Sequence, residues 1–347
     1  MSTRPVPAAE IRTDVVLHGP PERAAGAAAA AEARGIDGLL AAETRHDPFL
    51  ALASAAAGTG RIQLATGVAI AFARTPMTLA HSAWDLQRLS GGRAAIGLGS
   101  QVRPHITRRY GMPWSRPAAR MREFAAATRA VWHSWQTGER LDFRGDFYTH
   151  TLMTPMFDPG PLSHGAPPLR LAAVGPRMTS VAGEIGDGLI CHPFTTPRYL
   201  REVTLPTVRA ARARVEAAGE PWTVRPFEVS GTAMVVTGRT EEQLAANART
   251  VRERIAFYGS TPAYRPVLEQ HGWGALHEEL HMLSQEGRWQ EMGRRIDDEV
   301  LGAFAVVGEP EAAGRAVRER FAGLVDRITV SLPYDADDEL ALDVLGA

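Results

Sequence analysis

The sequence predicts an α/β fold of the (β/α)8, or TIM barrel, type with two insertions. Eight short apolar segments alternate with segments of helical periodicity, a pattern typical of a parallel sheet with both faces covered. The chain has 347 residues, which is long enough for one large barrel. An open nucleotide-binding sheet would carry a glycine fingerprint after its first strand, where this chain instead reads His18-Gly-Pro-Pro21.

The strands are predicted from one central strand–helix–strand unit and from the same alternation elsewhere in the chain. Ile62–Gly67 and Ala94–Leu98 are short apolar runs typical of buried strands, and a helical pattern lies between them. A crossover helix between two buried strands makes those strands parallel. The same alternation along the chain predicts eight strands, over residues 13–17, 38–42, 62–67, 94–98, 169–173, 187–191, 227–236 and 327–332.

Capping residues mark the helix starts. Asp47-Pro48 and Thr75-Pro76 each place a side-chain acceptor before a proline, which suits the first helical position. Thr240–Gln243 has the form of a capping box, and Gly91-Gly92 can end a helix in the left-handed conformation. The predicted helices span residues 22–34, 47–58, 75–90, 116–135, 176–185, 198–218, 240–258 and 310–321.

Two segments interrupt this alternation. Residues 138–168 are rich in proline, glycine and aromatic residues without a period, and residues 259–302 read as short helices. We interpret both as insertions into a single domain covering residues 1–347. Four large apolar side chains of the second insertion either form a lid over the barrel mouth or pack the insertion onto the barrel. They are Trp273, Met282, Trp289 and Met292.

Composition narrows the classes of partner. The net charge is −1, so nothing favours nucleic acid or a membrane surface. Cys191 is the single cysteine, which excludes an internal disulfide and a multi-cysteine metal site and fits a reducing cytosol. The N-terminus lacks the long apolar run of a signal peptide, and no stretch reaches the roughly 20 apolar residues of a spanning helix. We therefore expect a cytoplasmic protein that acts on a small molecule.

In a barrel, active groups gather at the carboxyl ends of the strands. Polar residues and glycines collect at these ends, and glycine allows the backbone to approach a ligand closely. The residues concerned are His18, Glu43, Thr44, His46, Thr66, Gly67, Val68, Gly99, Ser100, Gln101, Gly175, Pro176, Arg177 and His192. The pattern fits an active site, but the ordinary polarity of loops explains it equally well.

Two features of this rim suggest chemistry. The turn Val174–Met178 enters a helix, and its free N–H groups with the Arg177 guanidinium could seat a phosphate; the alternative is an ordinary strand-to-helix turn. Glu43 and His46 could form an acid–base pair, or Glu43 could instead bond Arg45 or the backbone.

A zinc protease motif occurs in the second insertion. His277–His281 reads H-E-x-x-H, which would put both imidazoles on one helical face with Glu278 as the base. No third ligand is evident, and the polar neighbours are typical of a solvated helix. The alternative to a zinc site is a surface helix with chance spacing.

Several motifs together resemble the bacterial luciferase-like flavin and deazaflavin oxidoreductases. Within that superfamily the chain is most similar to the branch that uses the deazaflavin coenzyme F420, including actinobacterial F420-dependent oxidoreductases. The similarity runs from about Thr13 to Ser331 and includes both insertions. The motifs are Thr66–Val68, Arg74–Leu79, Ser90–Gly99, Val174–Arg177 and Gly186–Gly188.

The resemblance implies where a deazaflavin would lie. In relatives, the position of Gly67-Val68 is often a non-prolyl cis peptide that forms a bulge behind the ring, so Val68 would back the ring. Thr66 and Gly67 belong to this strand end, and Glu43 matches an acidic residue near the ring. The matching contacts to the ribityl and pyrimidine parts are Gly99, Ser100, Gln101 and His105. The phosphate loop would be Val174, Gly175, Pro176, Arg177 and Met178.

Departures from the family pattern limit the substrate. Sugar-phosphate-oxidising relatives have a histidine directly after the acidic residue, where this chain has Thr44, and His46 is the nearest replacement. Lysines that bind sugar phosphate in those relatives have no match, because all 38 basic residues are arginine. A glucose-6-phosphate-type substrate is therefore not expected.

The resulting prediction is an F420-dependent oxidoreductase that moves a hydride between the deazaflavin C5 and a small organic substrate. Glu43, His46 and His192 are the expected proton-transfer residues. One alternative is an FMN-dependent monooxygenase on the same scaffold, and another is a flavin-binding barrel without turnover. The resemblance also implies a homodimer.

Overall fold

The computed structural model describes residues 11–220 and 225–346, and it contains two compact units. The N-terminal unit comprises residues 16–190 and 207–227, and the C-terminal unit comprises residues 11–15, 191–206 and 228–346. The first ten residues, on which the expectation of no signal peptide rests, lie outside the described part. Each unit is described separately below.

The strand topology confirms the predicted (β/α)8 barrel. The hydrogen-bonded order of the eight principal strands is β10-β12-β1-β2-β3-β5-β8-β9, and β9 pairs in turn with β10. All eight predicted strands are present, within a few residues of their expected bounds. They are β1 (Arg12–Val16), β2 (Gly38–Ala41), β3 (Gln63–Thr66), β5 (Ala94–Gly99), β8 (Leu169–Ala173), β9 (Gly188–Cys191), β10 (Glu228–Val236) and β12 (Arg327–Ser331).

In the N-terminal unit, β2, β3, β5 and β8 are parallel neighbours. Leu39 pairs with Leu64, Leu64 with Ala94, and Ile96 with Leu169. All six residues of β5 are buried, as expected for a parallel strand covered on both faces. The short strand β4 (Ala69–Ile70), which was not predicted, also pairs with β5 and extends the sheet beyond β3.

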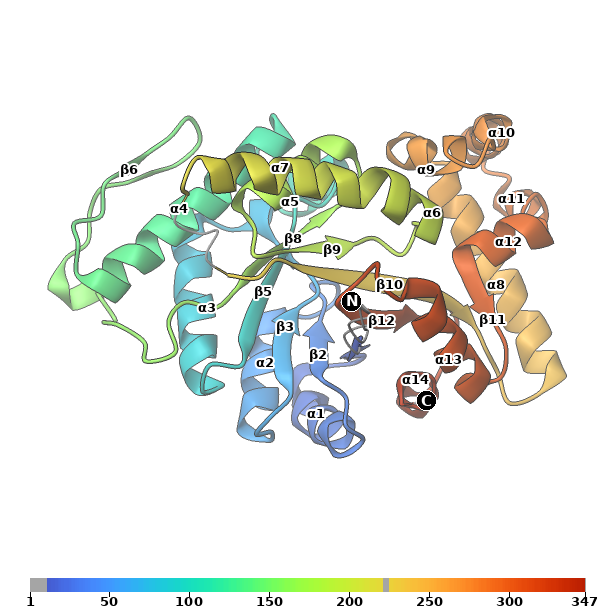
Figure 1. Cartoon of the computed structure of the whole chain (residues 1–347), viewed down its shortest axis with the longest axis horizontal. Coiled ribbons are helices and arrows are strands. Elements are labelled where there is room, and N and C mark those ends of the chain that lie inside the picture. The colour runs from blue at the N-terminus through green and yellow to red at the C-terminus, as the bar shows by residue number, and fades with distance from the viewer. Residues whose placement is uncertain (1–10, 221–224, 347) are drawn as a thin grey trace, which may run out of the picture. The chain divides into compact units, whose positions relative to one another are not determined.

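Helices cover this part of the sheet (Figure 1). They are α1 (Ala24–Ala33), α2 (Pro48–Ala57), α3 (Pro76–Leu89), α4 (Pro117–Thr137), α5 (Pro176–Ile185) and α7 (Leu205–Ala217). The predicted caps are present: Asp47 Oδ1 accepts from Phe49 N at 2.8 Å, and Thr75 Oγ1 accepts from Thr78 N at 3.1 Å. Gly91 and Gly92 have φ angles of 63° and 90°, so the turn after α3 uses the left-handed conformation as predicted.

The first insertion contains a small hairpin that the sequence did not predict. Strands β6 (Phe143–Arg144) and β7 (Thr149–His150) pair antiparallel. The Glu123 carboxylate of α4 holds their turn, accepting from the backbone N–H groups of Asp146, Phe147 and Tyr148 at 2.6–2.9 Å. This anchor depends on a residue about 23 positions away in sequence, so no local pattern could reveal it.

The C-terminal unit has its own parallel strands. β12 lies between β1 and β10, and its residue Ile328 pairs with both Thr13 and Gly231. The far end of β10 pairs with β11 (Ala305–Val307), a strand that was not predicted. A buried ion pair joins the first and last strands of the barrel, with Arg327 Nε 2.9 Å from Asp14 Oδ2.

Helices of the C-terminal unit include the predicted α8 and α13 and several short ones from the second insertion. Thr240 Oγ1 accepts from Gln243 N at 3.3 Å, and Gln243 Oε1 accepts from Arg239 N at 2.7 Å, a reciprocal cap at the start of α8. The helices are α6 (Pro197–Tyr199), α8 (Glu241–Gly259), α9 (Arg265–Glu269), α10 (Gly274–Gln285), α11 (Trp289–Arg294), α12 (Asp298–Phe304), α13 (Pro310–Phe321) and α14 (Asp338–Leu345).

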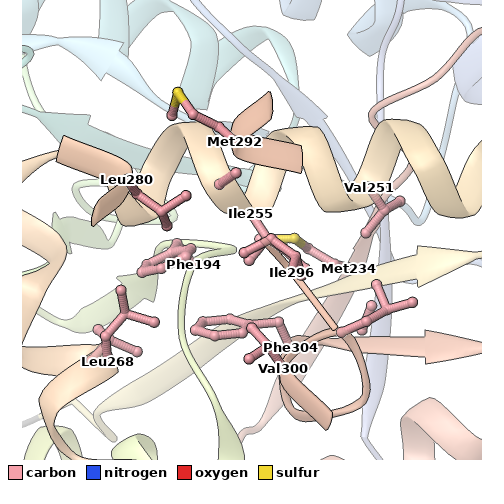
Figure 2. Packing of buried hydrophobic residues seen from close by; sticks show 14 of the residues in the cluster. Phe194, Met234, Val251, Ile255, Leu268, Leu280, Met292, Ile296, Val300 and Phe304 are labelled. Atoms are coloured by element: carbon pink, nitrogen blue, oxygen red, sulfur yellow. The ribbon is translucent and has the colours of Figure 1, made fainter. Parts of the chain in front are cut away.

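The second insertion packs as a hydrophobic core rather than as a loose flap. Figure 2 shows side chains of α9 to α12 converging with Phe194 and with residues of α8 and β10. Met292 is buried in this core, and Trp273 packs against it, as packing of the insertion predicts. Met282 and Trp289 instead expose 51% and 53% of their surface. Met292 and Trp273 therefore pack the insertion. These two residues give no support to the interpretation of the insertion as a lid.

None of the helices in the described part of the chain combines the length and the apolar character needed to cross a membrane.

Candidate active site

The end of β3 is bound tightly to β5. Thr66 is fully buried; its hydroxyl donates to the Gly97 carbonyl at 2.7 Å and accepts from the Gly97 N–H at 2.8 Å. A Cβ on Gly97 would lie 2.1 Å from the Thr66 carbonyl oxygen, so only glycine fits there. Because the Thr66 hydroxyl is used inside the sheet, this residue can contribute to a ligand site only by shaping the backbone.

The peptide bond between Gly67 and Val68 is cis, as the resemblance implied. A Cβ on Gly99 would lie 2.7 Å from Val68 Cγ2, so the Val68 side chain sits directly against the glycine at the end of β5. A Cβ on Gly67 would lie 3.0 Å from Leu40 Cβ. The structure thus brings together the ends of three neighbouring strands around the half-buried Val68.

Glu43 is held by several donors at the end of β2. Its Oε2 accepts from Arg74 Nη1 and from the Ile70 N–H, each at 2.6 Å, and its Oε1 accepts from Arg74 Nη2 at 3.0 Å. The two side chains are only 10% and 13% exposed. A bidentate arginine with a backbone donor stabilises the ionised carboxylate. The Glu43 backbone N–H also donates to the Val68 carbonyl at 3.1 Å, so this pair is joined to the cis peptide.

A tyrosine completes this cluster. Tyr110 Oη donates to Glu43 Oε1 at 3.4 Å. Burial raises the pKa of Tyr110, and the nearby Glu43 carboxylate raises it further, so the phenol stays protonated. The Arg109 guanidinium donates to the Thr44 carbonyl at 2.7 Å and stacks over the Tyr110 ring at 4.9 Å. We call Glu43, Arg74 and Tyr110 the Glu43 cluster.

The expected acid–base pair of Glu43 and His46 is not formed. His46 is exposed, and within the described residues it has no hydrogen bond or ion pair with Glu43. The alternative bond from Arg45 to Glu43 is absent there as well, because Arg74 supplies the guanidinium. The backbone alternative is present through Ile70.

Residues after β5 form a tight local turn. Gln101 has a φ angle of 59°, and its Oε1 accepts from the Val102 N–H at 2.9 Å. The Ser100 hydroxyl donates to the Gln101 carbonyl at 3.1 Å. His105 is exposed at the start of the π-helical segment His105–Arg109. Among the described residues, the side-chain amide nitrogen of Gln101 and the exposed His105 ring have no hydrogen-bond partner and are open to a ligand.

The turn Val174–Met178 leads into α5 as predicted. Gly175 is the N-cap, and no side chain caps the helix at that residue. The first N–H groups of a helix lack partners within it, and those of Arg177 and Met178 belong to this first turn. A Cβ on Gly175 would have no atom within 4 Å, and Arg177 is exposed. An open, uncapped helix start beside a guanidinium fits an anionic phosphate.

His192 lies in the C-terminal unit, directly after β9. Its Nδ1 accepts from the Phe194 N–H at 3.0 Å, and its Nε2 is 3.1 Å from Tyr264 Oη. Burial lowers the pKa of His192 to about 4, so the ring is neutral near pH 7. The neighbouring Cys191 thiol is buried, which raises its pKa to about 12 and makes it unreactive.

The H-E-x-x-H histidines have structural partners. His277 Nδ1 bonds the Gly259 carbonyl at 2.7 Å, and His281 Nδ1 bonds the Ser260 carbonyl at 2.9 Å. These carbonyls lie at the carboxyl end of α8, so the two rings cap that helix. The intended base, Glu278, is 68% exposed and pairs with Arg265 at 3.5 Å. Among the described residues no group of three potential ligands surrounds a metal position.

Sequence reasoning missed several residues of these clusters. Arg74 stood inside a quoted motif without an assigned role, although an arginine directly before a helix cap at the rim was a usable signal. Tyr110 and Tyr264 carried no such signal. Their roles depend on which side chains the fold brings beside Glu43 and His192.

Comparisons with known proteins identify the family and the proteins to which this chain is similar. Residues 5–327 match the model of the luciferase-like monooxygenase family. An uncharacterised protein of Mycobacterium tuberculosis strain H37Rv is 53% identical over 306 residues, 88% of each chain. The coenzyme F420-dependent tetrahydromethanopterin reductase of Methanopyrus kandleri has a TM-score of 0.75 at 22% identity, covering 97% of this chain and 98% of that one. An F420-dependent secondary alcohol dehydrogenase, solved with an F420–acetone adduct, has a TM-score of 0.69 at 17% identity, covering 97% of each chain.

Proposed function

The chain belongs to the luciferase-like monooxygenase family, and from this premise we propose that it is an F420-dependent oxidoreductase that transfers a hydride between the deazaflavin C5 and a small organic substrate. The observation that carries the proposal is the wall formed by Val68, Gly99 and the Glu43 cluster. Similarity to a putative coenzyme F420-dependent oxidoreductase of Mycobacterium tuberculosis, 30% identical over 84% of this chain, supports the choice of coenzyme.

The residues of the N-terminal unit fit such a coenzyme. Val68, pressed against Gly99, would back the ring, and the open groups of Gln101 and His105 would bind its polar flank. Gly175, Arg177 and Met178 would hold the phosphate at the uncapped start of α5. Among the residues that the structure describes, the Gln101 amide nitrogen, the His105 ring and the Arg177 guanidinium have no competing side-chain partner.

Proton handling is divided among the predicted residues. Glu43 is engaged by Arg74 and Ile70, so its carboxylate holds the wall in place and could accept a proton only if that pair opened. His46 is exposed, so its ring is open to water or to a substrate. His192 is a neutral ring at pH 7, and it can therefore act as a hydrogen-bond donor rather than as an acid.

Coenzyme preference separates this proposal from the FMN-dependent monooxygenase alternative, which the family name favours. Purified apoprotein would be titrated with F420 and with FMN, following the fluorescence of each. We expect tighter binding of F420. Tight FMN binding without F420 binding would overturn the proposal and support the alternative.

The phosphate seat can be tested with two arginine variants. Arg177→Ala should weaken F420 binding about tenfold, because it removes a charge-assisted contact to an anion. Arg209→Ala is the matched control, since Arg209 is an exposed arginine on α7 in the same unit. Equal affinities for Arg177→Ala and the wild type would remove this turn from the site.

The oligomeric state and the cellular compartment also belong to the proposal. The family resemblance leads us to propose a cytoplasmic homodimer acting on a small molecule. Analytical ultracentrifugation of the purified protein tests the oligomeric state, and a monomer at micromolar concentration would contradict it.

A further inference from the structure

In the His192–Tyr264 pair of the C-terminal unit, the hydrogen bonds determine which ring nitrogen carries a hydrogen and which group donates. His192 follows β9 and Tyr264 ends the short helix Pro262–Tyr264 in the second insertion. Tyr264 carried no assignment from the sequence. In a barrel, the residue after a strand belongs to the end where substrates bind, so the topology places His192 at that end.

The tautomer of His192 follows from its backbone contact. Nδ1 accepts a hydrogen bond from the Phe194 N–H at 3.0 Å, so this nitrogen cannot carry a hydrogen itself. A neutral ring must then carry its hydrogen on Nε2. The low pKa of His192, about 4, keeps the ring in this neutral form near pH 7. Nε2–H therefore donates to Tyr264 Oη, which lies 3.1 Å away.

This arrangement leaves the hydroxyl hydrogen of Tyr264 unused. The Tyr264 oxygen is the acceptor in its bond with His192, so its own hydrogen must point elsewhere. Within the described part of the chain, Tyr264 Oη has no second hydrogen-bond partner. Burial raises the pKa of Tyr264 to about 12, so the group remains a donor. The pair thus presents one O–H donor that needs an acceptor.

Aromatic neighbours hold both rings in position. Tyr258 meets the His192 ring edge-on at a centroid distance of 4.7 Å, and Phe194 packs against Tyr264 at 5.4 Å. In the same segment the Thr195 hydroxyl is buried without a hydrogen-bond partner, and only 8% of the residue is exposed. An unpaired buried polar group is costly, so an unpaired hydroxyl three residues after His192 is a second observation that points to a ligand near this segment.

We propose that the Tyr264 hydroxyl donates a hydrogen bond to a carbonyl oxygen of the organic substrate, with His192 as the positioning residue that orients it. This inference rests on the proposed oxidoreductase function. A ketone or enone suits the site because a neutral donor among aromatic rings matches a neutral acceptor. A carbonyl that undergoes reduction gains negative charge on its oxygen, which a positioned donor stabilises.

The direct test follows a carbonyl probe by NMR on the apoprotein. The probe is [1-13C]cyclohex-2-enone, whose carbonyl resonance moves downfield when its oxygen accepts a hydrogen bond. We expect this shift with the wild type and with Tyr258→Phe, and its loss with Tyr264→Phe. The two variants each remove one hydroxyl from the same aromatic cluster. No shift with the wild type, or equal shifts with both variants, overturns the proposal.

The positioning role of His192 has its own readouts. Nitrogen-15 spectra should show His192 with hydrogen on Nε2 and a bare Nδ1, and hydrogen on Nδ1 instead would overturn the proposal. His192→Gln retains an amide donor that can reach Tyr264, so it should preserve much of the probe shift, whereas His192→Leu should abolish it. Full retention of the shift by His192→Leu would remove His192 from the mechanism.

Turnover and coenzyme binding separate this inference from the proposed function. With F420H2 and cyclohex-2-enone, Tyr264→Phe should lose about tenfold in kcat/KM while Tyr258→Phe stays near the wild type. Absent turnover in the wild type with an intact probe shift would count against the proposed function alone. Weaker F420 binding by Tyr264→Phe with an unchanged probe shift would assign the donor to a coenzyme carbonyl and overturn the inference.

Discussion

The Glu43 cluster and the His192–Tyr264 pair differ in charge and in whether their polar groups have all their hydrogen bonds. Glu43 is charged, and both of its oxygens accept hydrogen bonds from Arg74, Ile70 and Tyr110. His192 is neutral and has its two nitrogens engaged, yet Tyr264 retains an unused hydrogen. The first arrangement has no capacity left for a ligand, whereas the second has one donor to offer.

This difference separates two kinds of polar residue that follow barrel strands. A carboxylate whose two oxygens both accept hydrogen bonds keeps its surroundings in place, because moving it would leave a charge unpaired. A neutral hydroxyl held from one side can bind a ligand without such a cost. The sequence placed Glu43 first among proton-transfer candidates, and that role stays a prediction; its contacts show that both carboxylate oxygens are hydrogen-bonded.

The largest effect is expected from breaking the Glu43–Arg74 pair. Glu43→Gln keeps an acceptor for the Ile70 N–H, but it removes the nearest negative charge from the Arg74 guanidinium. The next carboxylate is that of Asp47, whose Oδ2 lies 3.7 Å from Arg74 Nη2. We expect the free energy of unfolding to fall by roughly 3 kcal/mol, the range for a broken buried pair. Urea unfolding of the purified protein measures it.

The control is a double-mutant cycle. Arg74→Met removes the guanidinium and keeps an apolar chain of similar length, and the double variant leaves no unpaired charge. If the pair is coupled, the double variant should be more stable than the sum of the single losses implies. Simple additivity would show that Glu43 and Arg74 do not support each other.

A smaller effect is expected on acidification of the His192 site. The folded ring has a pKa of about 4, below its ordinary 6.5, so the unfolded chain takes up a proton first. Stability is therefore fully present above pH 6.5 and declines as the pH falls toward 4, by about 2 kcal/mol between pH 7 and pH 4.5. Melting temperatures between pH 7 and pH 4.5 measure this decline.

His192→Gln removes the titrating ring and should flatten that decline relative to the wild type. His46→Gln is the matched control, because it makes the same substitution at an exposed histidine. Identical curves for the wild type and His192→Gln would contradict the neutral buried histidine on which the inference about Tyr264 depends.

The smallest effect is expected at Glu32, a carboxylate of the N-terminal unit bonded only to backbone. It accepts from the N–H groups of Gly60, Arg61 and Ile62, and these bonds lower its pKa to about 2. Glu32→Gln should cost about 1 kcal/mol at neutral pH. Because the pKa is depressed, the stabilisation is present above pH 4.5 and disappears as the pH falls toward 2.

Several groups share these pH ranges. Burial also lowers the pKa values of His150 and His271, so only the part of the loss above pH 4.5 that His192→Gln removes belongs to His192. Carboxylates such as Glu32 add their loss below pH 4.5. A Glu32→Gln variant as stable as the wild type at pH 7 would show that these backbone contacts contribute nothing.

Much of the fold was predictable because its signals are local. Alternating apolar runs, the Asp47 and Thr75 caps and the Gly91-Gly92 turn each act within a few residues, and the structure confirms them. The unpredicted strands β4 and β11 have two and three residues, which is too short to produce a period. The hairpin of the first insertion depends on the distant Glu123.

The candidate site was predictable only in part. Strand ends and the family resemblance identified Glu43, Val68, Gly99 and the Val174–Met178 turn as a set, because position at the barrel end follows from strand order. Their partners were not identified, because Arg74 and Tyr110 reach Glu43, and Tyr264 reaches His192, through side-chain packing. A residue's chemistry depends on those partners, so the roles expected from the sequence stay predictions that the variants above test.

The sequence by itself determined that the chain is a (β/α)8 barrel, where its strands end and which residues stand at those ends, because hydrophobic period and capping are properties of neighbouring residues. Only the tertiary structure decided that Glu43 is bound by an arginine 31 positions later and that His192 faces a tyrosine 72 positions later. Such pairings depend on how distant segments pack, and no local pattern encodes them.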